Sequence, residues 1–425
     1  MASMRHAEAI AAFRRALEIR PAFPEAHTNL GILLEKEGHL AQAEMHFRLS
    51  LTGNPESPET LSNLADLLAK SKRFDEAVDL YEKSLSLKPS AATWSNYAVL
   101  LTCLKRDSDA EKAFGQSLQL DPENPNTRFN YAYLLLQKGY FREGWINLES
   151  RHAGRINVPD LPFRRWQGES LEGKSILIWP ELGFGDQIQF CRYAPLLKER
   201  GASKVVMACQ KELEALFSTL EGVETMPLCM PEAHFDYYSM PLSLPLHFDS
   251  IPAKPYLHAL PERIDNWRES IPDGKTRIGV TWQGNPLHEN DDMRSLPSLS
   301  LLKPLAELDG ISWVSLQKNS TEAKFPPFQL VDLGGKTEDF ADTAAIVSML
   351  DLVISVDTSV AHLAGALGKP CWILLPDYKT DWRWLDERND SPWYPSVRLF
   401  RQKRDWESVL QEVRDALASR LIPAQ

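Results

Sequence analysis

The chain has 425 residues, 43% of them hydrophobic and 25% charged, which is an ordinary globular composition in a chain too long for one core. A formal charge of −11 argues against a nucleic-acid partner, because binding a phosphate backbone needs an excess of lysine and arginine. No apolar run approaches the roughly 18 residues that span a bilayer. The first residues lack the apolar segment of a signal peptide, so none is expected. The five cysteines form no Cys-x-x-Cys pair, so a reducing, cytoplasmic setting is expected.

The first third of the chain repeats with a period near 34 residues. The recurring positions are Ala43, Phe47 and Pro55, then Ala77, Tyr81 and Pro89, then Ala110, Phe114 and Pro122. Small residues let two helices approach each other, the ring fills the gap to the next pair, and proline ends the second helix. The pattern resembles the tetratricopeptide repeat (TPR), which implies a helical solenoid over residues 1–152.

The first repeat matches only the second helix of a unit. In this repeat the recurring positions are occupied by Ala9, Phe13 and Pro21. The chain therefore reads as starting within a repeat, and we expect a longer parent protein that carries more of them.

An asparagine precedes the anchor residue of each first helix. The four positions are Asn29, Asn63, Asn96 and Asn130. First helices line the concave side of a TPR superhelix, so the four amides should form a ladder there. An asparagine side chain matches a peptide group in its donors and acceptor. The ladder resembles that of the TPR-bearing O-linked N-acetylglucosamine transferases, which implies an extended polypeptide as ligand; the alternative is an asparagine that is merely common in the repeat.

After a connector at 153–173, strands and helices alternate in two halves, 174–272 and 273–425. We expect strands at 175–179, 204–208, 277–282, 311–316, 351–356 and 371–375, with a closing amphipathic helix at 406–418. Strands that alternate with helices predict parallel sheets covered on both faces. Two such halves enclose a cleft, with ligands at the carboxyl ends of the strands. The fold class is therefore α plus α/β, a solenoid followed by two Rossmann-like domains.

Several motifs in these halves resemble the heptosyltransferase-type glycosyltransferases. They are Gly183-Phe-Gly-Asp186, Trp282-Gln-Gly-Asn285, Arg294-Ser295, Ser315-Leu-Gln-Lys318 and the run from Asp357 to Pro370. Ser391-Pro-Trp-Tyr-Pro395 resembles the bacterial subgroup with TPRs in front. The resemblance implies a GT-B pair of domains and inverting transfer from a nucleotide sugar, with the first half on the acceptor side and the second binding the donor.

A donor diphosphate needs positive partners. The strand at 351–356 leads through Asp357 into a helix whose first amides belong to Thr358 and Ser359, and helix N-termini bind anions. His362 lies one turn further on the same face. The alternative is that Asp357 or Thr358 simply caps this helix.

Two cations near strand ends of the same half are further candidates for the donor site. Arg294 and Lys318 could neutralise the leaving diphosphate, or be solvated surface cations. His288, in the loop after Trp282-Gln-Gly-Asn285, is an additional candidate.

Inverting transfer needs a base for the acceptor hydroxyl. Asp186 ends a loop whose glycines, Gly183 and Gly185, are expected beside the donor, and the resemblance implies that this aspartate is the base. The alternative is an N-cap, with Glu181 as reserve base. The only Asp-x-Asp, Asp107-Ser-Asp109, lies in a repeat, so no metal or other cofactor is expected.

Three functions remain open from the sequence. The first is a glycosyltransferase that modifies a polypeptide held by the TPR groove. The second is a lipopolysaccharide-type heptosyltransferase whose repeats recruit partners. The third is a non-catalytic TPR scaffold with a nucleotide-binding domain.

Overall fold

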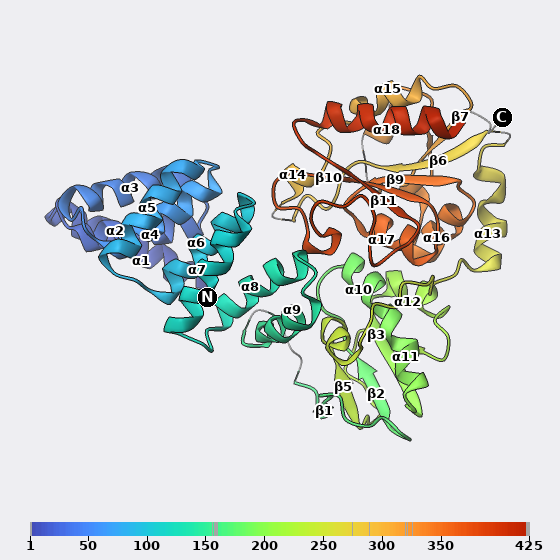
Figure 1. Ribbon diagram of the computed structural model, residues 1–425, viewed down its shortest axis with the longest axis horizontal. Helices are drawn as coiled ribbons and strands as arrows, with labels where there is room; N and C mark the ends of the chain where they lie inside the picture. Colours follow the sequence, from blue (N-terminus) through green and yellow to red (C-terminus); the bar gives the residue numbers. More distant parts are fainter. Residues whose placement is uncertain are drawn as a thin grey trace. The chain divides into compact units, whose positions relative to one another are not determined.

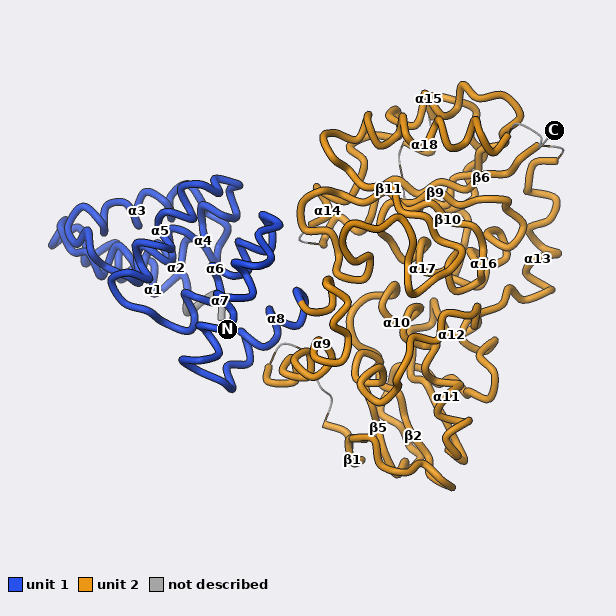
Figure 2. The backbone as a smooth tube through the Cα atoms, in the orientation of Figure 1, with its two compact units in different colours: residues 1–134 blue, residues 135–425 orange. Residues whose placement is uncertain are grey.

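The computed structural model describes residues 2–154, 156, 160–273, 275–288, 290–318, 320, 322–324 and 326–421. Positions 155 and 157–159 of the predicted connector and the end of the predicted second domain at 422–425 lie outside these residues. The chain divides into two compact units, Met1–Leu134 and Leu135–Gln425, which Figure 2 colours separately. The division falls within helix α8 (Pro125–Gln137).

The first unit is a helical TPR solenoid, as predicted. Its helices before α8 are α1 (Ala2–Ile19), α2 (Pro24–Lys36), α3 (Leu40–Gly53), α4 (Pro58–Lys70), α5 (Phe74–Leu87), α6 (Ala91–Cys103) and α7 (Asp107–Leu120). Helices α3, α5 and α7 each end two residues before the proline of the repeat, because proline cannot continue a helix. A Cβ on Gly31 would lie 2.6 Å from the Phe47 ring, so the small residue does allow close helix packing.

The fourth repeat finishes in the second unit. Helix α9 (Phe141–Leu148) is followed by the short helix η1 (Glu149–His152). The Trp145 ring lies 5.4 Å from Trp382, 5.9 Å from Phe190 and 6.3 Å from Trp393, measured between centroids. By register α9 is a repeat helix, as the predicted boundary at 152 implies, but it packs into the α/β part of the chain.

The first α/β domain has a five-stranded sheet in the order β1-β5-β2-β3-β4, with every neighbouring pair parallel. The strands are β1 (Arg164–Arg165), β2 (Ser175–Ile178), β3 (Lys204–Cys209), β4 (Glu224–Pro227) and β5 (Tyr237–Ser239). Its helices are α10 (Phe184–Phe190), η2 (Cys191–Tyr193), α11 (Ala194–Glu199), α12 (Lys211–Phe217) and η3 (Pro241–His247). Strand β1 lies in the predicted connector, so part of that segment belongs to this sheet.

The second α/β domain has a six-stranded parallel sheet in the order β11-β10-β9-β6-β7-β8. The strands are β6 (Thr276–Thr281), β7 (Ile311–Ser315), β8 (Val331–Asp332), β9 (Leu352–Val356), β10 (Cys371–Leu375) and β11 (Val397–Arg401). The helices are α14 (Asp291–Arg294), η5 (Leu299–Leu302), α15 (Lys303–Ala306), η6 (Glu322–Lys324), η7 (Gly334–Lys336), α16 (Phe340–Ser348), α17 (Ser359–Ala366), η8 (Trp382–Trp384) and α18 (Trp406–Leu421).

The two α/β domains face each other through their helices. Figure 1 shows α10 and α12 of the first domain beside α16 and α17 of the second, and both pairs are in contact. Between the domains, α13 (Pro261–Trp267) packs on α16, where Asp342 accepts from Arg263 at 2.9 Å and from the Trp267 indole at 3.0 Å. Helix α13 thus lies against the second domain, although it precedes the predicted boundary at 272.

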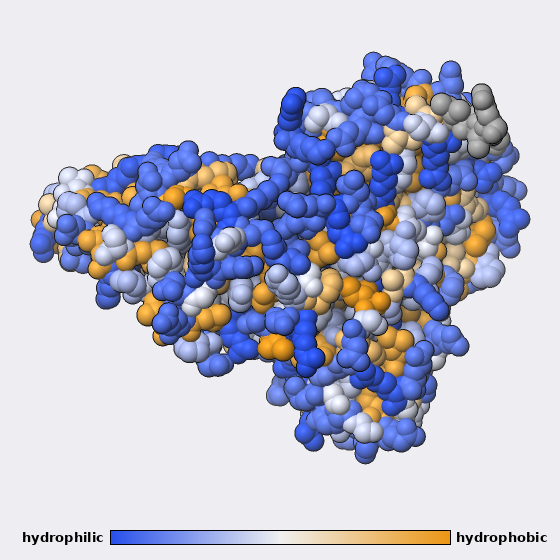
Figure 3. All heavy atoms as spheres, in the orientation of Figure 1, coloured by the Kyte–Doolittle hydropathy of each residue, from blue (hydrophilic) through white to orange (hydrophobic). Residues whose placement is uncertain are grey.

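Hydrophilic residues cover most of the face seen in Figure 3, with hydrophobic residues scattered among them. None of the helices in the described ranges is long and apolar enough to cross a bilayer.

Candidate functional site

The loop after β2 turns sharply into α10. Leu182 has φ of 60°, an uncommon conformation for a residue other than glycine, and its side chain is exposed. Gly183 is the N-cap, and its amide donates to Asp186 Oδ2 at 3.0 Å. Asp186 therefore closes the first turn of α10 while its side chain keeps 22% of its surface exposed. The capping role and an accessible carboxylate coexist in this geometry.

The loop after β9 leads into α17 in the second domain. Thr358 is the N-cap, but its hydroxyl contacts Ser355 Oγ at 3.1 Å and makes no bond to the first turn. The amides of Ser359 and Val360 belong to the four that a helix cannot pair itself. These donors, with the Thr358 and Ser359 hydroxyls, form an N-terminus suited to an anion.

The two turns meet across the interface between the domains. A Cβ on Gly185 would lie 3.0 Å from His362 Cδ2 and 3.6 Å from the Ser359 Cα. Glycine thus lets the first turn of α10 approach the first turn of α17 closely. The structure thereby brings Asp186, Gly183 and Gly185 from one half of the chain next to Asp357, Thr358, Ser359 and His362 from the other.

His362 is held neutral within this site. Its Nδ1 lies 3.1 Å from the Tyr394 hydroxyl, and its ring stacks on Trp384 with centroids 5.3 Å apart. Burial lowers the pKa of His362 well below its usual value, and the charges of Arg383, Arg192 and Arg294 lower it further. At neutral pH the imidazole can therefore offer a hydrogen bond but no charge.

Asp357 lies on the other side of His362, with its Oδ1 4.0 Å from His362 Nε2. Burial and the neighbouring Asp381 carboxylate raise the pKa of Asp357, whereas Arg294 and Arg383 oppose the rise. Three arginines thus act on this small region, and its positive potential comes from them rather than from the histidine.

Arg383, in η8, is the residue of this site that sequence reasoning missed. Its guanidinium pairs with Asp186 and donates to both Asp381 oxygens at 3.0 Å and to Gln189 Oε1 at 2.6 Å. A signal was present in the sequence, because the run Asp381-Trp-Arg-Trp384 follows strand β10 at the carboxyl edge of the sheet, where ligands bind. Without the fold, nothing in the run distinguishes it from an ordinary loop.

The two other predicted cations have different partners. Arg294 pairs with Asp291 at 3.2 Å and is close enough to lower the pKa values of both His362 and Asp357. Lys318 is exposed and donates to the Thr337 carbonyl at 2.7 Å. Arg294 thus acts electrostatically on the residues at the α17 N-terminus.

His288 and Glu181, the secondary candidates, have other surroundings. His288 is exposed in the loop after β6, and its Nδ1 accepts from the Asn290 amide at 3.2 Å. Glu181 is buried; Arg151 donates to its two oxygens at 2.9 and 3.0 Å, and the Leu242 amide donates at 2.8 Å. The Glu181 side chain is only 2% exposed, against 22% for Asp186, so Glu181 is less suited than Asp186 to meet an acceptor and take its proton.

The four asparagines occupy equivalent positions on α2, α4, α6 and α8. Asn29 is exposed, and the other three are partly buried. The Asn96 amide donates to Asp66 Oδ2 at 2.9 Å, and that of Asn130 to Ser95 Oγ at 3.4 Å. The Asn63 Nδ2 atom is buried without a partner among the described residues.

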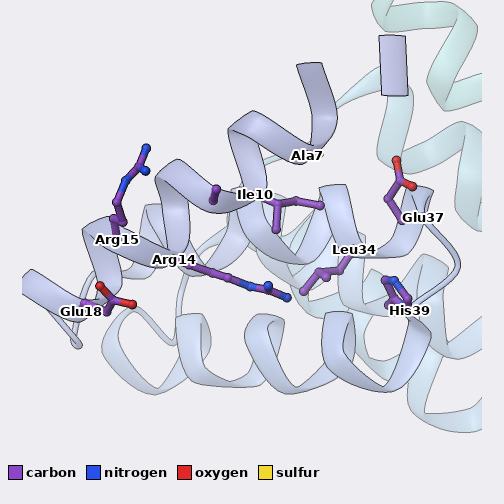
Figure 4. Close-up of a pocket in the computed structure, with 9 residues that line it drawn as sticks. Ala7, Ile10, Arg14, Arg15, Glu18, Leu34, Glu37 and His39 are labelled. Carbon is purple, nitrogen blue, oxygen red and sulfur yellow. The ribbon is translucent and has the colours of Figure 1, made fainter. Parts of the chain in front are cut away.

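No group of three or more His, Cys, Asp or Glu side chains in the described parts of the chain is arranged to hold a metal. A pocket in the repeat array lies between α1 and the end of α2, and Figure 4 shows Arg14 reaching across it towards Leu34. It belongs to the array and holds none of the predicted site residues.

Comparison with protein families matches three segments. Residues 5–38 match a TPR repeat, residues 58–91 a tetratricopeptide repeat, and residues 314–374 glycosyltransferase family 9 (heptosyltransferase). The chain joins TPRs to a glycosyltransferase family 9 domain. The family 9 segment contains Lys318 and the whole Asp357–His362 turn, whereas Asp186, Arg294 and Arg383 lie outside it.

Two known proteins are similar to longer stretches of the chain. The chain is 25% identical to protein FlbA of Caulobacter vibrioides over 81% of its own length and 70% of FlbA. It is also 27% identical to the inactive TPR repeat-containing thioredoxin TTL3 of Arabidopsis thaliana, over 40% of this chain and 24% of TTL3. The long alignment with FlbA extends well beyond the repeats, since they make up only about a third of the chain.

Some solved structures show a weak likeness to about a third of the chain. YrrB, described as a TPR protein with an unusual peptide-binding site, is 17% identical, with 34% of this chain and 75% of YrrB covered and a TM-score of 0.29. The pilF protein of Pseudomonas aeruginosa is 21% identical, with 37% and 72% covered and a TM-score of 0.33.

Proposed function

We propose that this TPR-containing glycosyltransferase moves a sugar from a nucleotide-sugar donor to a hydroxyl of a polypeptide, with inversion at the anomeric carbon. The observation that carries the proposal is the meeting of α10 and α17 through Gly185. The first turn of α10, which carries the partly exposed Asp186 carboxylate, lies against the first turn of α17, whose unpaired amides suit an anion. Two facing domains with this arrangement fit the GT-B organisation.

The proposed donor site is the first turn of α17. The Ser359 and Val360 amides and the Thr358 and Ser359 hydroxyls bind the diphosphate, and Arg294 and Lys318 offset its charge as it leaves. Neutral His362 positions a phosphate or sugar oxygen by hydrogen bonding. These donors supply the stabilisation that a metal gives in other transferases, so we expect turnover without a metal.

The proposed chemistry is a single displacement. The acceptor oxygen forms a bond to the anomeric carbon while the bond from that carbon to the phosphate oxygen breaks. The bonding pair leaves with the nucleoside diphosphate, and the acceptor proton passes to Asp186. The carboxylate becomes a carboxyl in this step and loses the proton to water afterwards.

The polypeptide acceptor is proposed from the asparagine ladder in the repeats. Side-chain amides at equivalent positions of successive units suit the backbone of an extended chain, because every residue of a peptide offers the same groups. Asn29, Asn63, Asn96 and Asn130 would thus hold the acceptor with little regard for its side chains.

The family match favours one alternative acceptor. Glycosyltransferase family 9 is described as a heptosyltransferase family, so a heptose donor and a lipopolysaccharide-type acceptor form a second candidate, with the repeats recruiting a partner protein. A non-catalytic scaffold is the third.

Release of nucleoside diphosphate from a panel of nucleotide sugars, with EDTA present, tests the proposal. The purified full chain should hydrolyse one donor slowly, and protein acceptors should accelerate the release. The variant Thr358→Val/Ser359→Ala is the matched negative. Release from no donor would favour the scaffold, and acceleration by a glycolipid alone would favour the second candidate.

A further inference from the structure

Arg383 is a buried cation whose partners come from both α/β domains. Its side chain is 7% exposed. It donates through one terminal nitrogen to Asp381, through Nε to Gln189 and through the other terminal nitrogen to Asp186. Asp381 belongs to its own loop, whereas Gln189 and Asp186 belong to α10 of the first domain.

Two aromatic rings lie beside the guanidinium. Its central carbon lies 4.3 Å from the centroid of Trp382 and 5.7 Å from that of Phe190. Planar stacking and a fork of donors are properties that lysine lacks. Arg383 therefore holds its partners in one geometry rather than attracting them as a mobile charge.

The loop that carries Arg383 is itself held in an unusual conformation. Lys379, Leu385 and Glu387 have φ of 52°, 52° and 53°, which is costly for residues other than glycine. From β11, Arg401 donates to the carbonyls of Trp384 at 2.6 Å and Leu385 at 2.9 Å. Such strain persists where neighbouring contacts impose it, and it often accompanies functional sites.

Two donors, one from each α/β domain, bind the two oxygens of the Asp186 carboxylate. The Gly183 amide binds Oδ2 and Arg383 binds Oδ1. Each carboxylate oxygen can accept a further hydrogen bond, and 22% of the side-chain surface of Asp186 is exposed. These two interactions hold the carboxylate in one orientation and so set the direction from which Asp186 can accept a proton.

The charges around Asp186 explain why it needs this partner. Burial raises the pKa of Asp186, and Asp381 from the facing loop and Glu181 from its own loop raise it further. Arg383 is the cation that opposes them. Asp357, in the loop before α17, and neutral His362, in α17, face the same region and add no positive charge.

The other elements packed against α10 offer no substitute for this cation. Arg294 acts on Asp357 and His362, and Arg192, after α10, points into an aromatic cage with its guanidinium 4.6 Å from Tyr394. The η3 segment contributes only His247, whose ring lies against Trp166.

We propose that Arg383 is a positioning residue that keeps Asp186 ionised and aimed at the acceptor hydroxyl, so that the base is completed by the donor-binding domain. This inference rests on the proposed function, in which Asp186 is the general base. Arg383 itself need not touch either substrate.

The first test measures the rate as a function of pH. The variants are Arg383→Gln, which removes the charge, and Arg383→Lys, which keeps it. The control is Arg388→Gln, an arginine of the same loop whose terminal nitrogen pairs with Asp390 at 2.6 Å. The fall of kcat/KM at acidic pH follows protonation of the base, Asp186. Loss of the Arg383 charge raises the pKa of Asp186, so this fall should begin at a higher pH.

In Arg383→Gln we expect at least a tenfold loss of kcat/KM at pH 7 and an acidic limb shifted upwards by about one pH unit or more. Arg383→Lys should show a smaller shift, and added guanidinium should restore part of the Arg383→Gln activity. The control should keep the wild-type profile. A uniform loss of rate with an unmoved limb would assign Arg383 a structural role only.

A second readout needs no turnover. Carbon-13 NMR of aspartate-labelled full chain gives the titration of Asp186, with its resonance assigned by its loss in Asp186→Asn. The midpoint should be higher in Arg383→Gln than in the wild type, and an equal midpoint in folded protein would overturn the inference even if the chain were active. Conversely, a raised midpoint in a chain that transfers no sugar would uphold the pairing while rejecting the proposed function.

Discussion

At the scale of single residues, the α17 N-terminus makes a direct prediction about donor affinity. Replacing Thr358 by Val and Ser359 by Ala removes two hydroxyl donors and leaves the helix amides in place. Hydrogen bonds to charged groups contribute about 1.5–3 kcal/mol, so nucleoside diphosphate affinity should fall roughly 10- to 150-fold. Titration calorimetry measures this, with the exposed Ser300→Ala as control. Equal affinities would move the diphosphate away from α17.

A second prediction concerns the base. Asp186→Asn keeps the size of the side chain and an oxygen for the Gly183 amide, but it removes the group that accepts the proton. Turnover should fall about 10²- to 10⁴-fold, the usual contribution of general acid–base catalysis, while donor affinity stays nearly constant. Steady-state kinetics and calorimetry separate the two effects, and the exposed Asp249→Asn is the control. Turnover near that of the wild type would exclude Asp186 as the base.

At the scale of elements, two helical glycines should respond to alanine in opposite directions. A Cβ on Gly365 in α17 would lie 2.5 Å from the Tyr394 ring, whereas one on Gly115 in α7 meets nothing within 4 Å. Gly365→Ala should cost about 1–3 kcal/mol through overpacking. Gly115→Ala should add about 0.5–1 kcal/mol through helix propensity. Thermal unfolding followed by circular dichroism would show the contrast, and shifts of the same sign would refute it.

The repeat array contains a buried carboxyl, that of Asp66, whose ionisation should lower the folding stability of the array. Burial raises the pKa of Asp66 to about 6, even though Tyr81 and Asn96 donate hydrogen bonds to it. A pKa above the unfolded value means that protonated Asp66 favours folding, and this contribution is lost as pH rises from about 4 through about 6. Compared with Asp66→Asn, the wild type should lose on the order of 1–3 kcal/mol between pH 4.5 and 7.

Urea unfolding at both pH values tests this, with the exposed Asp79→Asn as control. The control should follow the wild type. A difference between wild type and Asp66→Asn that does not change with pH would show that Asp66 titrates normally in the folded array.

The regular elements were predictable because their signals are local. Strands β2, β3, β6, β7, β9 and β10 appear where short apolar runs predicted them, and the repeat helices follow the 34-residue period. The two-residue strands β1 and β8 carry no such run, because they are defined by their partners in the sheet. The α17 turn could be picked out as a candidate donor site because its strand, polar loop and helix are contiguous.

The pairing of Arg383 with Asp186 was not predictable, since it joins residues 197 positions apart in the sequence. No periodicity or spacing relates them. For the same reason the sequence offered Glu181 as an alternative base, and only the buried contact with Arg151 shows how its carboxylate is engaged.

At the scale of the whole molecule, the asparagine ladder predicts that the repeats bind the acceptor while the α/β domains bind and cleave the donor. Replacing Asn63, Asn96 and Asn130 together by Ala should weaken transfer to a protein acceptor, while donor hydrolysis without acceptor stays unchanged. Contacts at every third residue or so of an extended chain read its backbone, so many acceptor sequences should be affected alike. The exposed Asn54→Ala is a control. If neither activity changed, the polypeptide acceptor would lose its main support.

The aromatic packing of Trp145 has a practical consequence for dissecting the chain. Its ring fills the space between Phe190, Trp382 and Trp393, which belong to both α/β domains. A polypeptide begun after residue 152 would uncover these rings and invite aggregation. One begun ahead of α9 would keep them covered. Helix α9 therefore belongs structurally to the α/β part of the chain. Exchange of repeat arrays between relatives should give folded protein only when α9 is kept together with its own α/β domains.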